Sequence, residues 1–399
     1  MSDKISISLD EVNSPEVDAK IRIDLAMLRT AEHQKEILRD YKPVPTTNGN
    51  IFYKTVVYLA LFGLGFGFVG WCASEIFMQV SEQAEKDAIE KARPEVERII
   101  KENAQEIKTK IDSGEITVEK HYYNIIMEIV SKDEEYQIIA LACTIFWYIL
   151  ICGIIGFGLS SAERFMEGNY SRAIICGLIA IGIGIPVGII GLFVAGFFYN
   201  TLGGGQLETN FAVQMFARAL AWLFIGCFVG IAPGMVMRNW KKFGLGVAGG
   251  AVGGLLGGLF FDPISIVTQT AVLSRLVGIV GFGVLAGIAI GLMEEAAKQG
   301  WLKVVAGVIA GKQFIIYKNP TVIGSSPKCE IYLFKDTDVM PQHAAIRQQG
   351  NSYIIEQLDQ RRPLFISGQP VQRHTLRNGD QIGIGKSLFV FGTKEIQNH

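Results

Sequence analysis

The stretch "AIICGLIAIGIGIPVGIIGLFVAGFFY", residues 173–199, contains no acidic or basic side chain. A helix needs about 20 mostly apolar residues to cross the hydrocarbon core of a bilayer. Six runs of this kind occur along the chain, at 56–78, 138–159, 173–199, 211–237, 244–262 and 272–293. The fifth is short and glycine-rich, but helix is favoured because the backbone must satisfy its own hydrogen bonds in lipid. The sequence therefore predicts an α-helical polytopic membrane domain with about six transmembrane helices.

The overall composition excludes several other classes of function. The 399-residue chain is 49% hydrophobic and has a formal net charge of −1. It lacks the basic excess typical of nucleic-acid-binding domains, so we expect no nucleic-acid partner. The six cysteines form no CxxC pair and have no histidine at ligand spacing, which argues against a zinc site and a disulfide framework. We expect no metal and no cofactor.

Loop charges predict the orientation of the spans. The turns after the second and fourth spans contain Arg164, Arg172, Arg238, Lys241 and Lys242. The alternate loops "NTLGGGQLETN" and "DPISIVTQT" contain no basic residue. Basic loops stay in the cytoplasm, so both termini are expected there. The segment 80–137 is then outside despite its basic residues, because charge counting weakens for long loops.

These observations divide the chain into five parts. Residues 1–50 are expected to form a cytoplasmic helical segment, either a docking arm or a solvated or membrane-surface helix. The remaining parts are a first transmembrane helix at 51–79, an extracytoplasmic helical segment at 80–137, a five-helix glycine-rich transmembrane bundle at 138–293 and a cytoplasmic domain at 300–399. We expect a multi-pass protein of the cytoplasmic (inner) membrane of a prokaryote.

The extracytoplasmic segment has one narrow apolar seam. It consists of Ile89, Val96, Ile100, Ile107 and Ile111. Spacings of four and seven residues are typical of a helix that packs along one stripe. A stop near Gly114 and a returning helix in "TVEKHYYNIIMEIV" would give a hairpin partner. Pairing between subunits is the alternative.

Glycines in the last spans recur on one helix face. They are Gly246, Gly250, Gly254 and Gly258 in the fifth span and Gly283, Gly287 and Gly291 in the sixth. Stacked small residues let two helix backbones approach closely in lipid, which predicts glycine-zipper packing. Packing inside one bundle, a homo-oligomer and a pore lining remain alternatives.

Two arginines mark an internal repeat. Arg218 and its following glycines in the fourth span recur without a gap as Arg275 and its glycines in the sixth, so the repeats are parallel. Charges inside a span are functional-site candidates by default. Near a helix end, however, an arginine can reach the interface or pair with Asp262. Anchoring or pairing is favoured over an anion-conducting role.

After residue 293 the sequence changes to short alternating strands separated by turns. "GN" at 350–351 and "NG" at 378–379 are strong signals for tight turns. Many short strands at regular spacing predict an all-β sandwich.

This region resembles the forkhead-associated (FHA) family over about 301–392. "LKVVAGVIAGKQFII" resembles the family's first strand, turn and second strand. "VIGSS" stands at the family's Gly-Arg, "DVMPQHA" at its Val-Ser-Arg-x-His-Ala, and "LRNGDQIGIG" at its closing Gly-Asp turn. The resemblance implies the FHA sandwich and a protein partner.

The departures from the family's pattern concern phosphate binding. FHA domains are generally phosphothreonine readers, but this chain has Ser325, Met340 and Arg362-Pro363 where the family has an arginine, a serine and polar residues. A phosphate dianion needs charge-assisted donors. We therefore expect phosphate-independent protein binding, with ordinary phosphothreonine reading as the alternative.

The resemblance also assigns roles to individual residues. The expected partner-binding loop tips are Ser325, Lys328, Met340, Gln342, Arg361 and Arg362. The expected framework residues are Gly324, His343, Gly379 and Asp380. In the family the histidine braces the binding loops, so His343 is expected to be structural.

The sequence leaves three classes of function to weigh: a scaffold or signalling protein, a channel or transporter, and an enzyme. A membrane-anchored scaffold or signalling protein presenting a divergent FHA domain is favoured. The alternative is a channel or transporter gated through that domain, although the spans offer few polar residues to line a path. No nucleophile, paired-carboxylate or metal constellation is present in the sequence, so an enzyme is not expected.

Overall fold

A computed structural model describes residues 29, 32, 36, 51, 54–105, 118–202, 211–268, 270–334 and 336–394. The helix expected within residues 1–50 therefore falls almost wholly outside the described residues. The seam positions Ile107 and Ile111, the expected stop at Gly114 and the side chain of Asp262 also lie outside them.

The described part of the chain before residue 300 is helical. Its helices are α3 (Thr55–Glu102), α5 (Val118–Val130), α6 (Glu134–Met166), α7 (Tyr170–Thr201), α8 (Phe211–Val236), α9 (Trp240–Thr268) and α10 (Ala271–Ala297). All except α5 are long and apolar enough to cross a membrane. The prediction of six such helices is confirmed, including the glycine-rich fifth span, which lies in α9.

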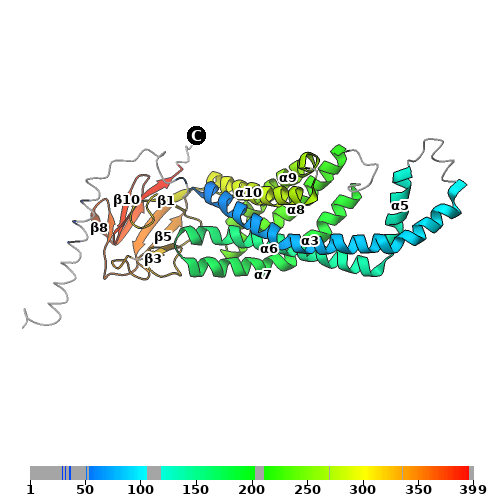
Figure 1. Ribbon diagram of the computed structural model, residues 1–399. Coiled ribbons are helices and arrows are strands. Elements are labelled where there is room, and N and C mark those ends of the chain that lie inside the picture. The colour runs from blue at the N-terminus through cyan, green and yellow to red at the C-terminus, as the bar shows by residue number, and fades with distance from the viewer. Residues whose placement is uncertain are drawn as a thin grey trace, which may run out of the picture.

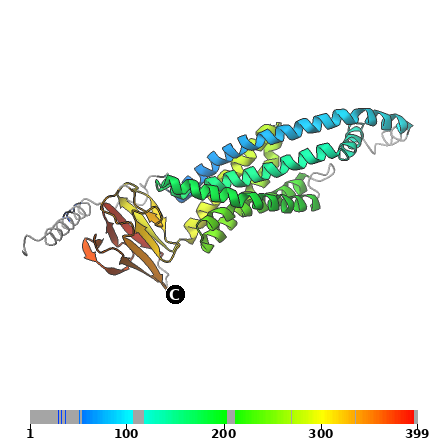
Figure 2. The ribbon, with the colours of Figure 1, turned by 90° about the horizontal axis from the view of Figure 1, so that it is seen from below.

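The first span does not end where its hydropathy ends. Helix α3 runs without interruption through Pro94 to Glu102 and projects beyond the other helices (Figures 1 and 2). Helix α5 packs against this extension, and Val96, Ile126 and Val130 are buried between them. The apolar seam thus has a hairpin partner within the same chain, with Lys91 and Asp133 paired at 2.9 Å beside it.

Glycines bring several helix backbones into direct contact. A Cβ atom on Gly250 of α9 would overlap the carbonyl oxygen of Gly226 of α8. A Cβ on Gly287 of α10 would similarly overlap the carbonyl oxygen of Leu59 of α3. Gly244, also on α9, has open space where its Cβ would lie. Close contact is therefore confined to particular faces of these helices.

Residues 300–393 form a β-sandwich at one end of the helices (Figure 1). Its strands are β1 (Gly300–Ala306), β2 (Gln313–Ile315), β3 (Thr321–Gly324), β4 (Ile331–Tyr332), β5 (Ala344–Gln349), β6 (Ser352–Gln357), β7 (Leu364–Ile366), β8 (Gln369–Val371), β9 (Arg373–Leu376), β10 (Gln381–Ile384) and β11 (Ser387–Thr393). One sheet has the order β2-β1-β11-β10-β7-β8 and the other β4-β3-β5-β6-β9.

The sandwich core follows from the alternation of the strands. Leu302, Ile323, Ile355 and Phe389 come from four different strands and are completely buried between the sheets. The expected all-β sandwich is confirmed. Strands β8 and β9 were not foreseen, because most of their residues are polar or exposed and give no apolar alternation.

Candidate functional site

Three loops of the sandwich converge at one edge. The loop after β3 is bonded to the loop before β5, since the Ser325 N–H donates to the Met340 carbonyl at 2.9 Å and the Ser326 N–H to the Pro341 carbonyl at 3.1 Å. Gly324 permits this approach, because a Cβ there would overlap the Pro341 carbonyl oxygen. The predicted loop tips around Ser325 and Met340 are thus neighbours.

His343 joins these loops to the third one. Its side chain is completely buried. Nδ1 accepts a hydrogen bond from the Met340 N–H at 3.3 Å, and Nε2 lies 3.1 Å from the Pro363 carbonyl oxygen. Both contacts fit a neutral imidazole protonated on Nε2, and burial lowers the pKa of His343. The residue braces the loops and is not free to meet a ligand.

The two arginines of the third loop already have carboxylate partners. Arg361 pairs with Asp359 at 2.6 Å, and Arg362 lies 3.4 Å from Asp338. The hydrogen bond from Arg361 lowers the pKa of Asp359 to about 2. The positive charge expected at this edge is therefore largely offset.

The other predicted loop-tip and framework residues lie in the loops and in the turn before β10. Lys328 and Gln342 are exposed, whereas Ser325 and Met340 are half-buried. Gly379 has φ +92°, in the left-handed region that favours glycine. Beside it, the Asp380 carboxylate accepts the Arg377 N–H at 2.8 Å and holds the turn before β10.

Comparison with known proteins identifies the sandwich. The FHA domain model matches residues 321–385. An oxoglutarate dehydrogenase inhibitor from Corynebacterium jeikeium is 34% identical over 107 residues, covering 26% of this chain and 72% of that protein. The chain belongs to the FHA-domain proteins.

Other relatives match the same region. The glycogen accumulation regulator GarA of Mycobacterium tuberculosis is 32% identical over 92 residues, which cover 23% of this chain and 56% of that protein. Among solved structures, the FHA domain of the CT664 protein from Chlamydia trachomatis is 26% identical, with a TM-score of 0.23 over 24% of this chain and 99% of that chain. Each of these matches covers about a quarter of the chain.

The FHA domain contacts the bundle through two similar turns. In the α6–α7 turn, Asn169 caps α7 by accepting the Arg172 N–H and donates from Nδ2 to the Pro327 carbonyl at 3.2 Å. In the α8–α9 turn, Asn239 accepts the Lys242 N–H and donates to the Tyr317 carbonyl at 3.2 Å. From the sequence, only the charges of these turns were interpreted. Both turns also share a visible pattern, Gly or Arg followed by Asn and an aromatic residue.

A buried cluster of charges lies at the same junction. Its members are Glu163, Arg164 and Glu167 at the end of α6, Lys242 on α9, Glu294 on α10 and Lys312 between β1 and β2. Lys242 lies 2.5 Å from Glu163 and 3.5 Å from Glu294. Lys312 of the FHA domain, which is 1% exposed, lies 3.2 Å from Glu167. Burial lowers the pKa of Lys312, although Glu167 and Glu163 act in the opposite direction.

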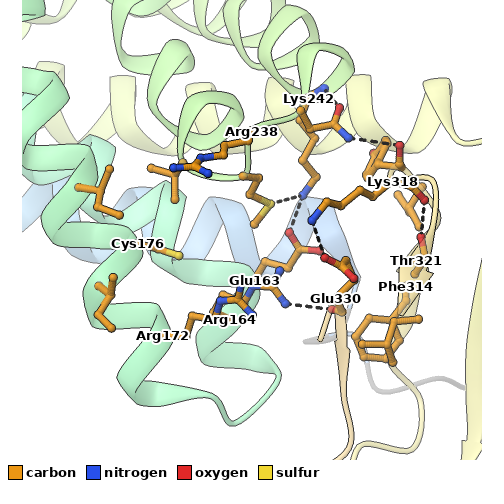
Figure 3. A pocket seen from close by; sticks show the side chains of 18 residues that line it. Glu163, Arg164, Arg172, Cys176, Arg238, Lys242, Phe314, Lys318, Thr321 and Glu330 are labelled. Carbon is orange, nitrogen blue, oxygen red and sulfur yellow. Dashed lines mark hydrogen bonds and ion pairs between the residues drawn. The ribbon is translucent and has the colours of Figure 1, made fainter. Parts of the chain in front are cut away.

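Beside this cluster is a pocket of about 600 Å³ between the bundle and the FHA domain (Figure 3). Its walls come from α6, α7, the α8–α9 turn and strands β2 to β4. Within the described ranges, no group of three or more His, Cys, Asp or Glu side chains is placed to hold a metal ion.

The charges predicted within the spans have several partners. Arg275 makes two hydrogen bonds to Glu75 of α3, at 2.7 and 3.1 Å, and lies 3.0 Å from Glu82. Sequence reasoning did not name these partners, although Glu75 is the one carboxylate in the run "GWCASEIF". The guanidinium of Arg218 lies 4.8 Å from the Phe261 ring centre.

Proposed function

We propose that the protein is an integral membrane scaffold or signalling protein that presents its FHA domain to a cytoplasmic protein partner. The observation that carries this proposal is the docking of the FHA domain on the end of six apolar helices through both Asn turns. A docked domain is held at a fixed position relative to the membrane. This arrangement suits the recruitment of a partner to the membrane surface.

The loop geometry supports partner binding that does not depend on phosphate. Ser325 and Met340 occupy positions where the family has phosphate donors, and Arg361 and Arg362 are already paired with carboxylates. A phosphate would have to displace these carboxylates before gaining charge-assisted hydrogen bonds. The shape of the loop tips would then contribute most of the recognition, with Arg361 and Arg362 still supplying polar contacts to the partner.

Peptide binding by the full-length protein tests this proposal. A phosphothreonine peptide is expected to bind no more than about tenfold tighter than its unmodified twin, a difference of about 1.4 kcal/mol. The variant Ser325→Arg/Met340→Ser, which adds the missing donors, should raise that ratio above tenfold. Fluorescence anisotropy with paired peptide libraries measures both. A submicromolar phosphothreonine ligand of the unchanged protein, lost on dephosphorylation, would contradict the proposal.

Capture of the partner tests the loop tips themselves. Replacing Arg361 and Arg362 by glutamine should weaken partner capture and leave the thermal stability nearly unchanged, because loop-tip residues contribute little to core packing. The matched control is Arg347→Gln/Arg373→Gln, which removes two exposed arginines from strands β5 and β9. Equal capture by both variants would place the binding surface elsewhere.

The proposed orientation places both termini in the cytoplasm and the α3–α5 hairpin outside. It rests on the loop charges and on the prokaryotic inner membrane as the expected location. We expect a Gln105→Cys side chain, in a chain otherwise free of cysteine, to react with an impermeant maleimide on intact cells. Lys328→Cys should react only after permeabilisation. The reverse labelling pattern would show that the bundle is inverted.

Glycine-zipper packing and parallel repeats belong to the same proposal. The overlaps at Gly250 and Gly287 support close packing within one chain, rather than between subunits. A homo-oligomer is not needed to account for these faces. The alternative of a gated channel has no supporting observation among the described spans, since Arg275 is neutralised by Glu75 and Glu82. We also propose that the protein is not an enzyme.

A further inference from the structure

The pocket between the bundle and the FHA domain has an excess of positive charge. Its walls contain five cationic and two acidic side chains. Three of the cations have carboxylate partners: Arg164 with Glu167, Lys242 with Glu163, and Lys318 with Glu330. The remaining two are Arg172 and Arg238, and neither has an ion-pair partner among the described carboxylates.

These two arginines lie in the two Asn turns. Arg172 donates only to main-chain carbonyl oxygens, at Pro327 and Cys329 of the FHA domain. Arg238 is exposed, with φ +50°, whereas Gly168 at the corresponding position of the other turn has φ +73°. An arginine in this left-handed conformation is strained, whereas a glycine adopts it without strain. Two guanidinium groups thus face the pocket with capacity for an anion.

Beyond Arg172, the α7 wall of the pocket is apolar and exposed. Ile175 and Ile179 lie one turn apart on α7 and are 55% and 47% exposed. Tyr170 and Trp240, which begin α7 and α9, are 58% and 85% exposed. Exposed aromatic residues at the ends of apolar helices are typical of the membrane–water interface. The arginines therefore lie at headgroup level, and the isoleucines extend from there toward the hydrocarbon.

We infer that this pocket binds an anionic phospholipid of the cytoplasmic leaflet, with Arg172 and Arg238 holding its phosphate group and an acyl chain lying along Ile175 and Ile179. The inference rests on the proposed orientation of the bundle. Basic pockets between membrane helices on the cytoplasmic side are suited to acidic headgroups. A soluble phosphate compound would use the arginines but would gain nothing from the apolar wall.

The test uses the full-length protein in mild detergent, with native mass spectrometry of bound lipid. Phosphatidylglycerol should be retained in preference to phosphatidylcholine. Arg238→Gly should lower that preference about fivefold, the effect of one basic residue near an anionic headgroup. The variant suits the turn because Gly168 occupies the matching position, so it should fold at least as well. Adding Arg172→Gln should lower the preference further, and Arg238→Lys should keep most of it.

Matched controls separate a built site from diffuse attraction. Lys241 is exposed in the first turn of α9, close to Arg238 in sequence, and is absent from the pocket wall, so Lys241→Gln should leave the lipid preference unchanged. Equal losses in Lys241→Gln and Arg238→Gly would overturn the inference. So would equal retention of the two lipids.

Competition by a soluble phosphate compound, together with a variant of the apolar wall, distinguishes a lipid from a soluble phosphate ligand. Millimolar glycerol phosphate should not displace phosphatidylglycerol, and Ile175→Ser/Ile179→Ser should weaken lipid retention. Displacement by glycerol phosphate would overturn the lipid assignment. Partner capture by the Arg361/Arg362 variant reports on the FHA loops alone, so failure of the lipid site leaves that result unaffected.

Discussion

Gly250→Leu is expected to destroy the packing of α8 on α9. The added side chain would meet the backbone of Gly226, which cannot rotate away as a side chain could. Overpacking of a well-packed interior usually costs about 1–3 kcal/mol, and a backbone obstruction lies at or above that range. For a domain of this size, about 3 kcal/mol corresponds to a fall of roughly 10 °C in Tm.

The helix itself provides the matched control. Gly244 lies on the same helix and has open space at its Cβ position, so Gly244→Leu should leave the Tm within a few degrees of the unchanged protein. The same comparison holds on α10, where Gly287 meets the backbone of Leu59 and Gly281 meets nothing. Thermal unfolding in detergent measures all four variants. If the members of each pair had equal Tm values, these faces would not be in close contact.

The helical architecture could be read from the sequence because lipid imposes a simple rule. An uncharged run such as 173–199 must be a helix, and α7 spans it. This rule does not predict where the helix of the first span ends, because hydropathy gives the length of the apolar run and not the length of the helix. After residue 79 the chain becomes charged, yet α3 continues to Glu102 and packs on α5.

The FHA sandwich was predictable for a different reason. Strands such as β1 and β6 alternate between buried and more exposed residues, and the resemblance to the FHA family covers most of the sandwich. The neutralisation of Arg361 and Arg362 was not predictable, because it depends on how the loop bends back onto Asp359 and across to Asp338. Loop conformation is set by local hydrogen bonds that no periodic pattern encodes.

The junction between bundle and FHA domain could not be derived at all. It brings together Glu163, Lys242, Glu294 and Lys312, which are far apart in the sequence. Taken singly, each is a charged residue at the end of a span or in a turn, where solvent exposure is the ordinary expectation. The docking of the two domains brings Lys312 against the Glu163 carbonyl and the Glu167 carboxylate. The same docking creates the pocket that we assign to a lipid.

The buried cluster leads to the second large effect, which is expected from Lys312→Met. The cluster contains three carboxylates and three cations, so it is balanced when intact. Methionine matches the lysine in size but leaves one buried negative charge without compensation. Breaking a buried ion pair in this way typically costs 3–5 kcal/mol. We expect the contact to open, with faster hydrogen exchange in residues 311–312 and 326–330, while the FHA core stays protected.

Two further variants test whether charge balance is the cause. Lys318→Met is the same substitution at the rim of the pocket, where the lysine pairs with Glu330 but is 55% exposed, so the cost should stay below about 1 kcal/mol. Lys312→Met/Glu167→Gln restores neutrality, because one charge of each sign is removed. Burial lowers the pKa of Lys312, because desolvation opposes its charge, so the cost of Lys312→Met comes mainly from the buried carboxylate that is left without compensation. The double variant should therefore be more stable than Lys312→Met and close to the unchanged protein, giving a coupling of about 3 kcal/mol in a double-mutant cycle. Additive effects of the two substitutions would mean that Lys312 acts by packing, and that the charges at this junction do not hold the domains together.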